Sequence, residues 1–496
     1  MNREFLINAI FLVLVNLLIK PFYVFGIERV IQDRVGAETY GLYATLFSFS
    51  FLLFMVNDFG IHYFNNRTIA QNPPLAKKYI PNILILKGLL AVLFMGLVFV
   101  AALLRGFEAG VFYLLFFVAL NHILISLVAY LRSNVSGVGM YRTDSVISTL
   151  DKVFLIIICA VLLWANPFDE SGVFQIKWFV HAQNIAWLMT ATAAFFIIAQ
   201  KIKPRFKWRP DWPFLWIILK KSFPFALAVF LMTAYIRFDI VILEWMLPDG
   251  RYHAGVYAAS YRLLDAFNMV GYLFAGLLLP MFSKMLSPHS VEKEGVPSLL
   301  RFALQLIWAG TLTLAAACFF FQKEIMELLY PLSVNAENVG YYGETMGYLI
   351  LTLVPFSGVY IYSTLLTANN SLAKMNRLYV VGIVVNVLLN LLLIPRQQAI
   401  GSALAAFITH SVVLAGMVWL AKKELRLPTR FMQIVKVVGF TLVTLVANYA
   451  IYHFISFNWV IKFITCILSG SVLAFLFKLI QLNVLFNLVK KKEKLA

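Results

Sequence analysis

The sequence predicts an all-α integral membrane protein that crosses the bilayer about fourteen times. Of its 496 residues, 61% are hydrophobic and only 13% are charged, whereas about 25% are charged in an average soluble domain. Apolar runs of about 20 residues, each long enough to span a hydrocarbon core of about 30 Å as a helix, recur along the whole chain. The lysines and arginines between these runs are concentrated in alternate loops, which is typical of a multi-span membrane protein.

Each predicted span is one of these apolar runs. The first run follows Arg3, as the apolar part of a signal peptide would, but no small-residue cleavage site follows it, so we expect it to be retained as the first helix. The spans are predicted at residues 5–25, 41–61, 83–104, 111–131, 147–165, 179–200, 223–246, 256–281, 302–322, 346–368, 378–394, 401–421, 437–456 and 462–482.

The distribution of charge predicts the orientation in the membrane. The formal net charge is +18, which a nucleic-acid-binding protein could also have. Here the basic residues lie in alternate loops, and the positive-inside rule places those loops and both termini in the cytoplasm. We therefore expect attraction to anionic lipid headgroups and no nucleic-acid partner. The basic loops lie near residues 3, 67–78, 132–152, 201–221, 284–301, 374–377, 422–436 and 490–494.

The sequence contains no pattern typical of a catalytic or metal site, and no cofactor is expected. Cys159, Cys318 and Cys466 fall within predicted spans and have no paired spacing. The seven histidines are scattered along the chain, and no glycine-rich phosphate-binding loop occurs. The sequence therefore predicts a transport protein and not an enzyme, with energy drawn from an ion or substrate gradient and not from ATP.

The chain is predicted to contain two similar halves. A basic, proline-containing cytoplasmic linker at 201–222 separates a six-helix lobe at 1–200 from a second six-helix lobe at 223–421. Because six predicted spans separate the repeated motifs, both halves cross the membrane in the same direction, as in the parallel repeats of some transporters. Two further transmembrane helices at 437–482 and a basic cytoplasmic tail at 483–496 lie outside this plan. The repeated motifs are Tyr40-Gly41-Leu42-Tyr43-Ala44 and Ala254-Gly255-Val256-Tyr257-Ala258.

Three cations lie within predicted spans, where ionisable side chains are costly and usually functional: Lys20, Arg237 and Arg262. We interpret them as facing a water-filled cavity between the halves, where they would bind an anionic substrate group such as phosphate. Arginine suits phosphate because its planar guanidinium donates paired hydrogen bonds. Two alternatives are open: Lys20 extends to the outer headgroups, and Arg262 pairs with Asp265, three residues further along the same helical face.

Asp58, Asp239 and Asp265 are candidates for ion coupling or for charge pairing. A carboxylate inside a membrane protein can carry a coupling proton or sodium ion. Asp58 is predicted near the cytoplasmic end of its span, where exposure to solvent is an equal alternative. Asp239 lies two residues from Arg237 and therefore does not share its helical face.

Short motifs in both halves are typical of one family of membrane proteins. In the first half they are Arg34-Val35-Gly36-Ala37-Glu38-Thr39-Tyr40-Gly41-Leu42-Tyr43, Asp58-Phe59-Gly60-Ile61 and Arg67-Thr68-Ile69-Ala70. In the second half they are Gly255-Val256-Tyr257-Ala258 with Tyr261-Arg262-Leu263, then Asn386 and Asn390 followed by Ile394-Pro395 and Ile400-Gly401-Ser402-Ala403-Leu404-Ala405. With these motifs the chain resembles the polysaccharide lipid flippases of the multidrug/oligosaccharidyl-lipid/polysaccharide exporter superfamily. It departs from them at Gln397-Gln398, where that family often has a glycine turn.

The resemblance implies two six-helix lobes around a central cationic cavity, which an alternating-access movement opens to one face at a time. It also implies the substrate: an undecaprenyl-diphosphate-linked oligosaccharide, moved from the cytoplasmic to the outer leaflet of the bacterial cytoplasmic (inner) membrane for O-antigen, capsule or exopolysaccharide assembly. A coupling ion, proton or sodium, and membrane lipids are the other expected partners. A peptidoglycan lipid precursor flippase, an ion-coupled exporter of the same superfamily, and an integral-membrane glycan enzyme such as a polymerase or acyltransferase stay open as alternatives.

Overall fold

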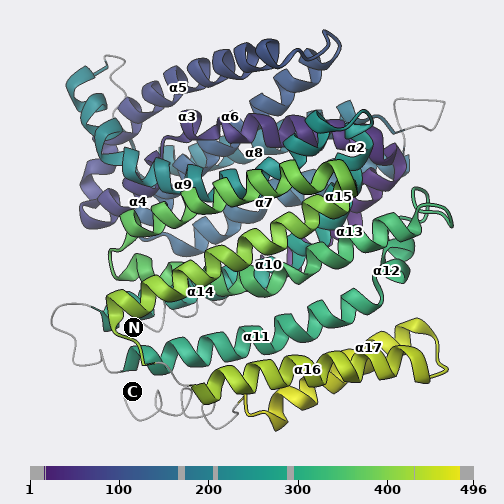
Figure 1. The fold of residues 1–496 in the computed structure, drawn as a ribbon. Coiled ribbons are helices and arrows are strands. Elements are labelled where there is room, and N and C mark those ends of the chain that lie inside the picture. Colours follow the sequence, from purple (N-terminus) through teal and green to yellow (C-terminus); the bar gives the residue numbers. More distant parts are fainter. Residues whose placement is uncertain are drawn as a thin grey trace. The chain divides into compact units, whose positions relative to one another are not determined.

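The computed structural model describes residues 16, 18–165, 174–204, 210–286, 295–428 and 431–480. Nearly all of these residues are in helices, and no strand occurs among them. The predicted all-α class is therefore confirmed (Figure 1). Most of the first predicted span, at 5–25, and the whole tail at 483–496 lie outside the described residues.

The helices fall into two compact units that alternate along the chain. Unit 1 comprises Met1–Arg262 and Ile383–Ser402, and unit 2 comprises Leu263–Gly382 and Ala403–Ala496. The boundaries between the units lie within α10 and α15, so each of these two helices contributes to both units. This division rests only on contacts between helices. It does not test the six-helix lobes, the linker and the two additional helices that the sequence predicts, and these stay predictions.

The helices of unit 1 precede those of unit 2 along most of the chain. Unit 1 contains η1 (Tyr23–Glu28), α2 (Arg29–Leu52), α3 (Phe54–Asp58), α4 (Ile61–Gln71), η2 (Pro73–Leu75), α5 (Ala76–Arg105), α6 (Val111–Gly137), α7 (Tyr141–Ala160), η3 (Val161–Ala165), α8 (Ile176–Lys201) and α9 (Trp212–Met246). α10 (Gly250–Met285) and α15 (Leu372–Leu425) are shared. Unit 2 contains α11 (Val296–Phe320), α12 (Gln322–Leu329), α13 (Val339–Leu351), α14 (Leu353–Ala368), α16 (Phe431–Phe454) and α17 (Trp459–Leu476).

The helix lengths are those of a multi-pass membrane protein. Among the described residues, ten helices are long and apolar enough to cross a membrane, or twelve if each of two bent pairs forms one span. α15 counts as one helix, yet its 54 residues would extend about 80 Å, far more than a hydrocarbon core of about 30 Å. α15 therefore covers two of the predicted spans, 378–394 and 401–421. A multi-pass protein is confirmed, and the number fourteen stays a prediction.

α15 is interrupted at Gln398, within the predicted loop. Gln398 has φ 52° and ψ −127°, a conformation that glycine adopts readily and that costs other residues about 1–3 kcal/mol. α2 is interrupted in the same way at Gly36, with φ 79° and ψ 166°, where the residue is a glycine and the conformation is unstrained. The chain thus turns at Gln398 without a glycine at this position.

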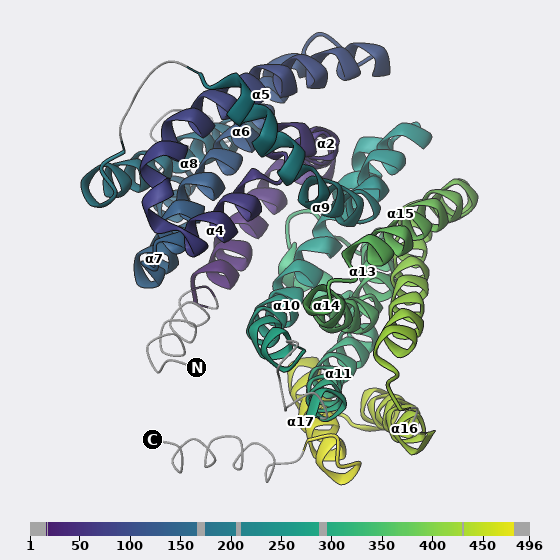
Figure 2. The same cartoon turned by 90° about the vertical axis from the view of Figure 1, so that its left-hand side faces the viewer.

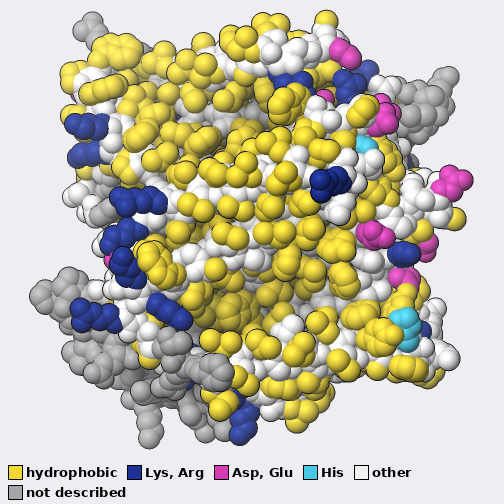
Figure 3. Space-filling view, viewed as in Figure 1, with side chains coloured by type: hydrophobic (Ala, Val, Ile, Leu, Met, Phe, Trp, Pro, Cys, Tyr) yellow, Lys and Arg dark blue, Asp and Glu magenta, His cyan; other side chains and the backbone are white. Residues whose placement is uncertain are grey.

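The surface of the helices is apolar along their length. On α5, Leu86, Leu90 and Phe94 are buried, while Val92 and Leu104 are more than half exposed. A helix that is apolar on all sides is expected where one side contacts lipid. Figure 3 shows, on the visible face, apolar side chains along the middle of the helices and Lys and Arg gathered near one end, with Asp, Glu, His and a few further Lys and Arg near the other. The orientation in the membrane stays a prediction.

In unit 2, the last two helices pack on α11. The views in Figures 1 and 2 agree in placing α16 and α17 beside α11, and Ala309 of α11, Phe440 of α16 and Ala474 of α17 share one buried apolar cluster. Gly470 of α17 faces Thr313 of α11 so closely that a methyl group at Gly470 would overlap the threonine side chain. Small residues at such contacts let membrane helices approach and gain packing energy.

Candidate functional site

Arg237 lies on α9 among aromatic rings. Its guanidinium carbon is 6.0 Å from the ring centroid of Phe47, 5.8 Å from that of Phe51 and 5.6 Å from that of Tyr261. No Asp or Glu of the described chain forms an ion pair with it. Cation–π contacts engage the faces of the guanidinium and leave its N–H groups able to donate to an anion.

The rings around Arg237 belong to an aromatic ladder on α2, formed by Tyr40, Tyr43, Phe47 and Phe51. Successive ring centroids are 5.4, 6.0 and 6.0 Å apart, as the three- and four-residue spacing on one helical face allows. Arg262 of α10 lies at the other end of the ladder, with its guanidinium carbon 5.9 Å from the Tyr40 ring centroid. The two cations therefore contact different parts of one aromatic surface.

Arg262 has a carboxylate partner that the sequence analysis did not find. Its Nη2 is 3.0 Å from Oε1 of Glu28, a buried residue at the end of η1. The Tyr40 hydroxyl donates to the same oxygen at 2.8 Å. In this structure the charge of Arg262 is thus balanced by Glu28, in contrast to Arg237.

Lys20 is half-buried and has a different set of neighbours. The charged side chains that act on it most strongly are Lys152, Asp151 and Arg132. The same helix approaches α7 through Asn16, whose Nδ2 donates to Ser148 Oγ at 3.3 Å. The structure therefore brings Arg237 and Arg262 to one aromatic surface and leaves Lys20 beside α7.

Asp239 is buried on α9 and accepts three hydrogen bonds from neutral groups. They come from the Tyr257 hydroxyl at 2.7 Å, Asn386 Nδ2 at 2.9 Å and Asn390 Nδ2 at 2.8 Å. Ser402 donates to Asn390 Oδ1 at 2.8 Å. No Lys, Arg or His of the described ranges pairs with the carboxylate. A buried carboxylate without a cation is suited to take up a proton or a small cation.

Asp58 has the opposite environment, because a buried lysine neutralises it. Lys87 Nζ lies 2.9 Å from Asp58 Oδ1, and both side chains are almost fully buried. Ser126 donates to the same oxygen at 3.1 Å, and His62 Nδ1 lies 2.8 Å from Asp58 Oδ2. Asp58 is thus a charge-paired residue in this structure. Asp265 is half-buried on the part of α10 that belongs to unit 2.

The two glycines of the repeated motif contact each other's helices within unit 1. A methyl group at Gly41 of α2 would overlap the backbone of Arg251 and Gly255, and one at Gly255 of α10 would overlap the carbonyl of Ala37. Gln32 Nε2 also donates to the Gly255 carbonyl at 3.1 Å. The motif that predicted the repeat therefore marks a close helix crossing, of the kind that glycine permits in membranes.

Three ion pairs join segments of the predicted first half to α9 or α10 near this crossing. They are Arg105–Glu244 at 2.9 Å, Arg251–Glu108 at 3.7 Å and Arg262–Glu28 at 3.0 Å. We refer to these pairs and the glycine crossing as the outer clasp, because the predicted orientation puts their helix ends outside. No feature of the sequence indicated which of these charges would pair.

The fold is similar to that of several solved transporters and of a flippase. An inward-closed lipid II flippase MurJ superposes with a TM-score of 0.69 at 15% identity, over 96% of this chain and 98% of that one. An inward-facing multidrug resistance MATE family transporter gives 0.64 at 15% identity, over 84% and 98%. A MOP superfamily transporter from Pyrococcus furiosus, described as having a binding pocket of reverse polarity, gives 0.58 at 15% identity, over 85% and 95%.

The chain belongs to the polysaccharide biosynthesis protein family, whose model matches residues 5–286. The matched region covers more than half of the chain and includes the aromatic ladder, Arg237, Asp239 and Arg262. No curated protein matches the sequence. The predicted family is therefore confirmed, and the solved structures show that its fold is shared with transporters and a flippase.

Proposed function

We propose that this protein is an alternating-access flippase that moves an undecaprenyl-diphosphate-linked oligosaccharide from the cytoplasmic to the outer leaflet of the bacterial cytoplasmic membrane, with both termini in the cytoplasm. The family match supports a role in polysaccharide assembly. The observation that carries the proposal is Arg237, a half-buried guanidinium held by aromatic faces without a carboxylate partner among the described residues. A diphosphate would supply the acceptor oxygens that its N–H groups lack.

The cations have different roles in this proposal. Arg237 binds the diphosphate, because its charge is not neutralised by a described residue. Arg262 is held by Glu28 while the outer clasp is closed, and it becomes available to the anion when the clasp opens. Lys20 adds positive potential beside α7, where it attracts the anion without a contact that the structure defines.

Release to the outer leaflet requires the outer clasp to separate. The Gly41–Gly255 crossing and the three ion pairs hold α2, α9 and α10 together in this structure. Breaking exposed ion pairs costs little, whereas separating Glu28 from Arg262 costs more for as long as the carboxylate stays buried. In the opened state the anionic group of the substrate would take the place of Glu28 at Arg262. Because the substrate makes this contact only in the opened state, its binding favours that state.

We also propose Asp239 as the residue that couples flipping to an ion. Rotation of the Asn386 and Asn390 amides by half a turn would replace their N–H groups with oxygens facing the carboxylate. Together with the Tyr257 and Ser402 hydroxyls, these oxygens would form the all-oxygen environment that a hard cation such as sodium prefers. A proton on Asp239 is the alternative, and it needs no such rotation.

The test of the substrate site is Arg237→Ala in a strain that depends on this protein for surface polysaccharide. Loss of a charge-assisted contact weakens anion binding about tenfold or more, so we expect polysaccharide to be lost while the amount of protein in the membrane is unchanged. Arg396→Ala, at an exposed cation beside the break in α15, is the matched control and should behave as wild type. Normal polysaccharide in Arg237→Ala would overturn the assigned role.

A second candidate is flipping of the peptidoglycan lipid precursor. It is favoured by the superposition on the lipid II flippase, which covers 96% of this chain, where the MATE transporters cover less. Both substrates carry the diphosphate that Arg237 would bind, so the two candidates differ in the group attached to that diphosphate. Rescue of a bacterium depleted of its lipid II flippase would support this candidate, and rescue of polysaccharide alone would support the first. A change in the glycan's covalent structure in liposomes would instead indicate an enzyme.

A further inference from the structure

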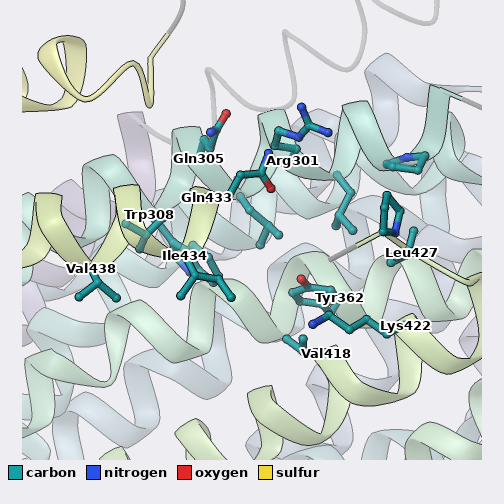
Figure 4. Close-up of a pocket in the computed structure, with 15 residues that line it drawn as sticks. Arg301, Gln305, Trp308, Tyr362, Val418, Lys422, Leu427, Gln433, Ile434 and Val438 are labelled. Atoms are coloured by element: carbon teal, nitrogen blue, oxygen red, sulfur yellow. The ribbon is translucent and has the colours of Figure 1, made fainter. Parts of the chain in front are cut away.

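A separate pocket lies within unit 2, whereas the cations discussed above belong to unit 1. It encloses about 370 Å³ between α11, α14, the last turns of α15, the connection that follows it and α16. Figure 4 shows polar and apolar side chains grouped around this space. The polar side chains that line it are Arg301, Gln305, Trp308, Tyr362, Lys422 and Gln433.

The pocket is positively charged. Arg301 and Lys422 line it, and none of the lining residues that the structure describes is acidic. The nearest acid in sequence to Lys422 is Glu424, and its Oε2 is occupied by Lys374 at 2.6 Å. Glu424 therefore does not neutralise Lys422, which can contact an anion in the pocket. Arg301 adds a planar guanidinium of the kind that binds phosphate.

Several donors in the pocket have no hydrogen-bond partner among the described residues. The indole Nε1 of Trp308 is buried without one, although a buried indole N–H usually finds a partner. Gln305, Tyr362 and Gln433 likewise make no hydrogen bond to a described side chain or backbone group. Gln305 follows Arg301 by one helical turn, and Figure 4 shows both near Gln433. This arrangement suits a ligand rich in acceptor oxygens.

The remaining walls are apolar and continue onto the exposed face of α16. Leu304 and Val437 line the pocket, and so do Ile434 and Val438, which are 53% and 51% exposed. A cavity of 370 Å³ has room for a polar headgroup but not for two acyl chains as well, so the chains must lie outside it. The exposed apolar side chains of α16 provide a surface for them.

We propose that this pocket binds the headgroup of an anionic glycerophospholipid, with its phosphate held by Arg301 and Lys422 and an acyl chain lying along Ile434 and Val438. These residues lie near the basic loops, so the lipid belongs to the cytoplasmic leaflet. Because the pocket joins α16 to α11, α14 and α15, the lipid would fasten the additional helices to the rest of unit 2. This inference is independent of the substrate assigned above.

The experiment measures lipid retained by the purified full chain in native mass spectrometry, with phosphatidylglycerol and phosphatidylcholine of identical acyl chains. The wild type should retain phosphatidylglycerol preferentially. Removing two basic groups beside an anionic headgroup costs about tenfold or more in affinity, so Arg301→Gln combined with Lys422→Gln should lose that preference. The control combines Arg377→Gln, near the start of α15, with Lys423→Gln, in its last turn; both cations are exposed and do not line the pocket, so the control should keep the preference.

A second variant tests the pocket without changing its charge. Ile434→Trp should fill the mouth of the pocket and reduce retention of phosphatidylglycerol about as much as removal of the cations does. The proposal is overturned if the wild type does not distinguish the two lipids, if the pocket variants retain phosphatidylglycerol, or if the control loses it equally. It is also overturned if inorganic phosphate displaces the lipid completely from the wild type, because the site would then recognise phosphate alone.

Discussion

The Glu28–Arg262 pair of the outer clasp can be tested by a double-mutant cycle. Its atoms are 3.0 Å apart, Glu28 has a side-chain exposure of 4%, and Arg262 has one of 21%. Removal of one partner from a buried pair costs about 3–5 kcal/mol when the remaining charge stays buried. Arg262→Met strands the buried carboxylate, so we expect a cost of about 3 kcal/mol, or about 150-fold in the closed-to-open ratio.

Glu28→Gln should cost less. The remaining charge is Arg262, which already reaches solvent, and the Tyr40 hydroxyl can still donate to the amide oxygen of glutamine. We expect about 1 kcal/mol, or about a fivefold change. The double variant Glu28→Gln/Arg262→Met should recover most of the loss seen in Arg262→Met, because no buried charge is left without a partner.

The assay is labelling of a buried cysteine from outside intact cells. Ala254 is buried next to Gly255 in the crossing, so Ala254→Cys, in a background without the three native cysteines, should react with a membrane-impermeant maleimide only when the clasp opens. The labelling rate should rise most in Arg262→Met and least in Glu28→Gln. Equal rates in the two single variants, or a double variant faster than both, would refute the assignment of Glu28 as the buried partner.

Three further outcomes are expected. Gln398→Gly should stabilise the protein by about 1 kcal/mol because it relieves the positive φ. Gln397→Gly, in the helix beside it, should destabilise the protein by about the same amount. A shift of both melting temperatures in the same direction, measured by thermal unfolding in detergent, would contradict this prediction. In wild type, sodium but not choline chloride should raise the melting temperature, and Asp239→Asn should abolish the difference; a sodium effect that persists would exclude Asp239 as the site. Asp58→Asn and Lys87→Met should each reduce the folded yield, since each leaves a buried group unpaired, and the combined variant should fold better than either; a combined loss equal to the sum would show that the two residues act independently.

The general architecture follows from the sequence because membranes constrain it strongly. Backbone groups within lipid must be satisfied by a helix, so apolar runs translate directly into spans. Arg237 and Asp239 were found in the same way, since an ionisable residue in an apolar run is conspicuous. The partners of these two residues could not be predicted from the sequence, because the pairing of Asp239 with Asn386 and Asn390 depends on which helices become neighbours.

The burial of Glu28 is a second feature that could not be predicted from the sequence. The first span was predicted to end at residue 25, which placed Glu28 in an outer loop where a carboxylate has no consequence. The helix instead continues through the π-helical turn Tyr23–Glu28 into α2, so the carboxylate is buried. The eighth span was likewise predicted from 256, whereas α10 begins at Gly250, which puts Arg262 about 18 Å along its helix. Hydropathy detects the apolar centre of a span and underestimates polar ends that are buried by other helices.

The Gly41–Gly255 crossing bears on how such a chain could arise. Each glycine occupies the same place in its copy of the repeated motif, and each lies against the other's helix. A patch that packs on its own copy is the defining property of a self-complementary dimer interface. A half-length polypeptide with one such glycine would therefore find its partner in a second molecule, and gene fusion would convert that dimer into a single chain. By the same logic, the two halves produced as separate polypeptides should reassociate through this crossing.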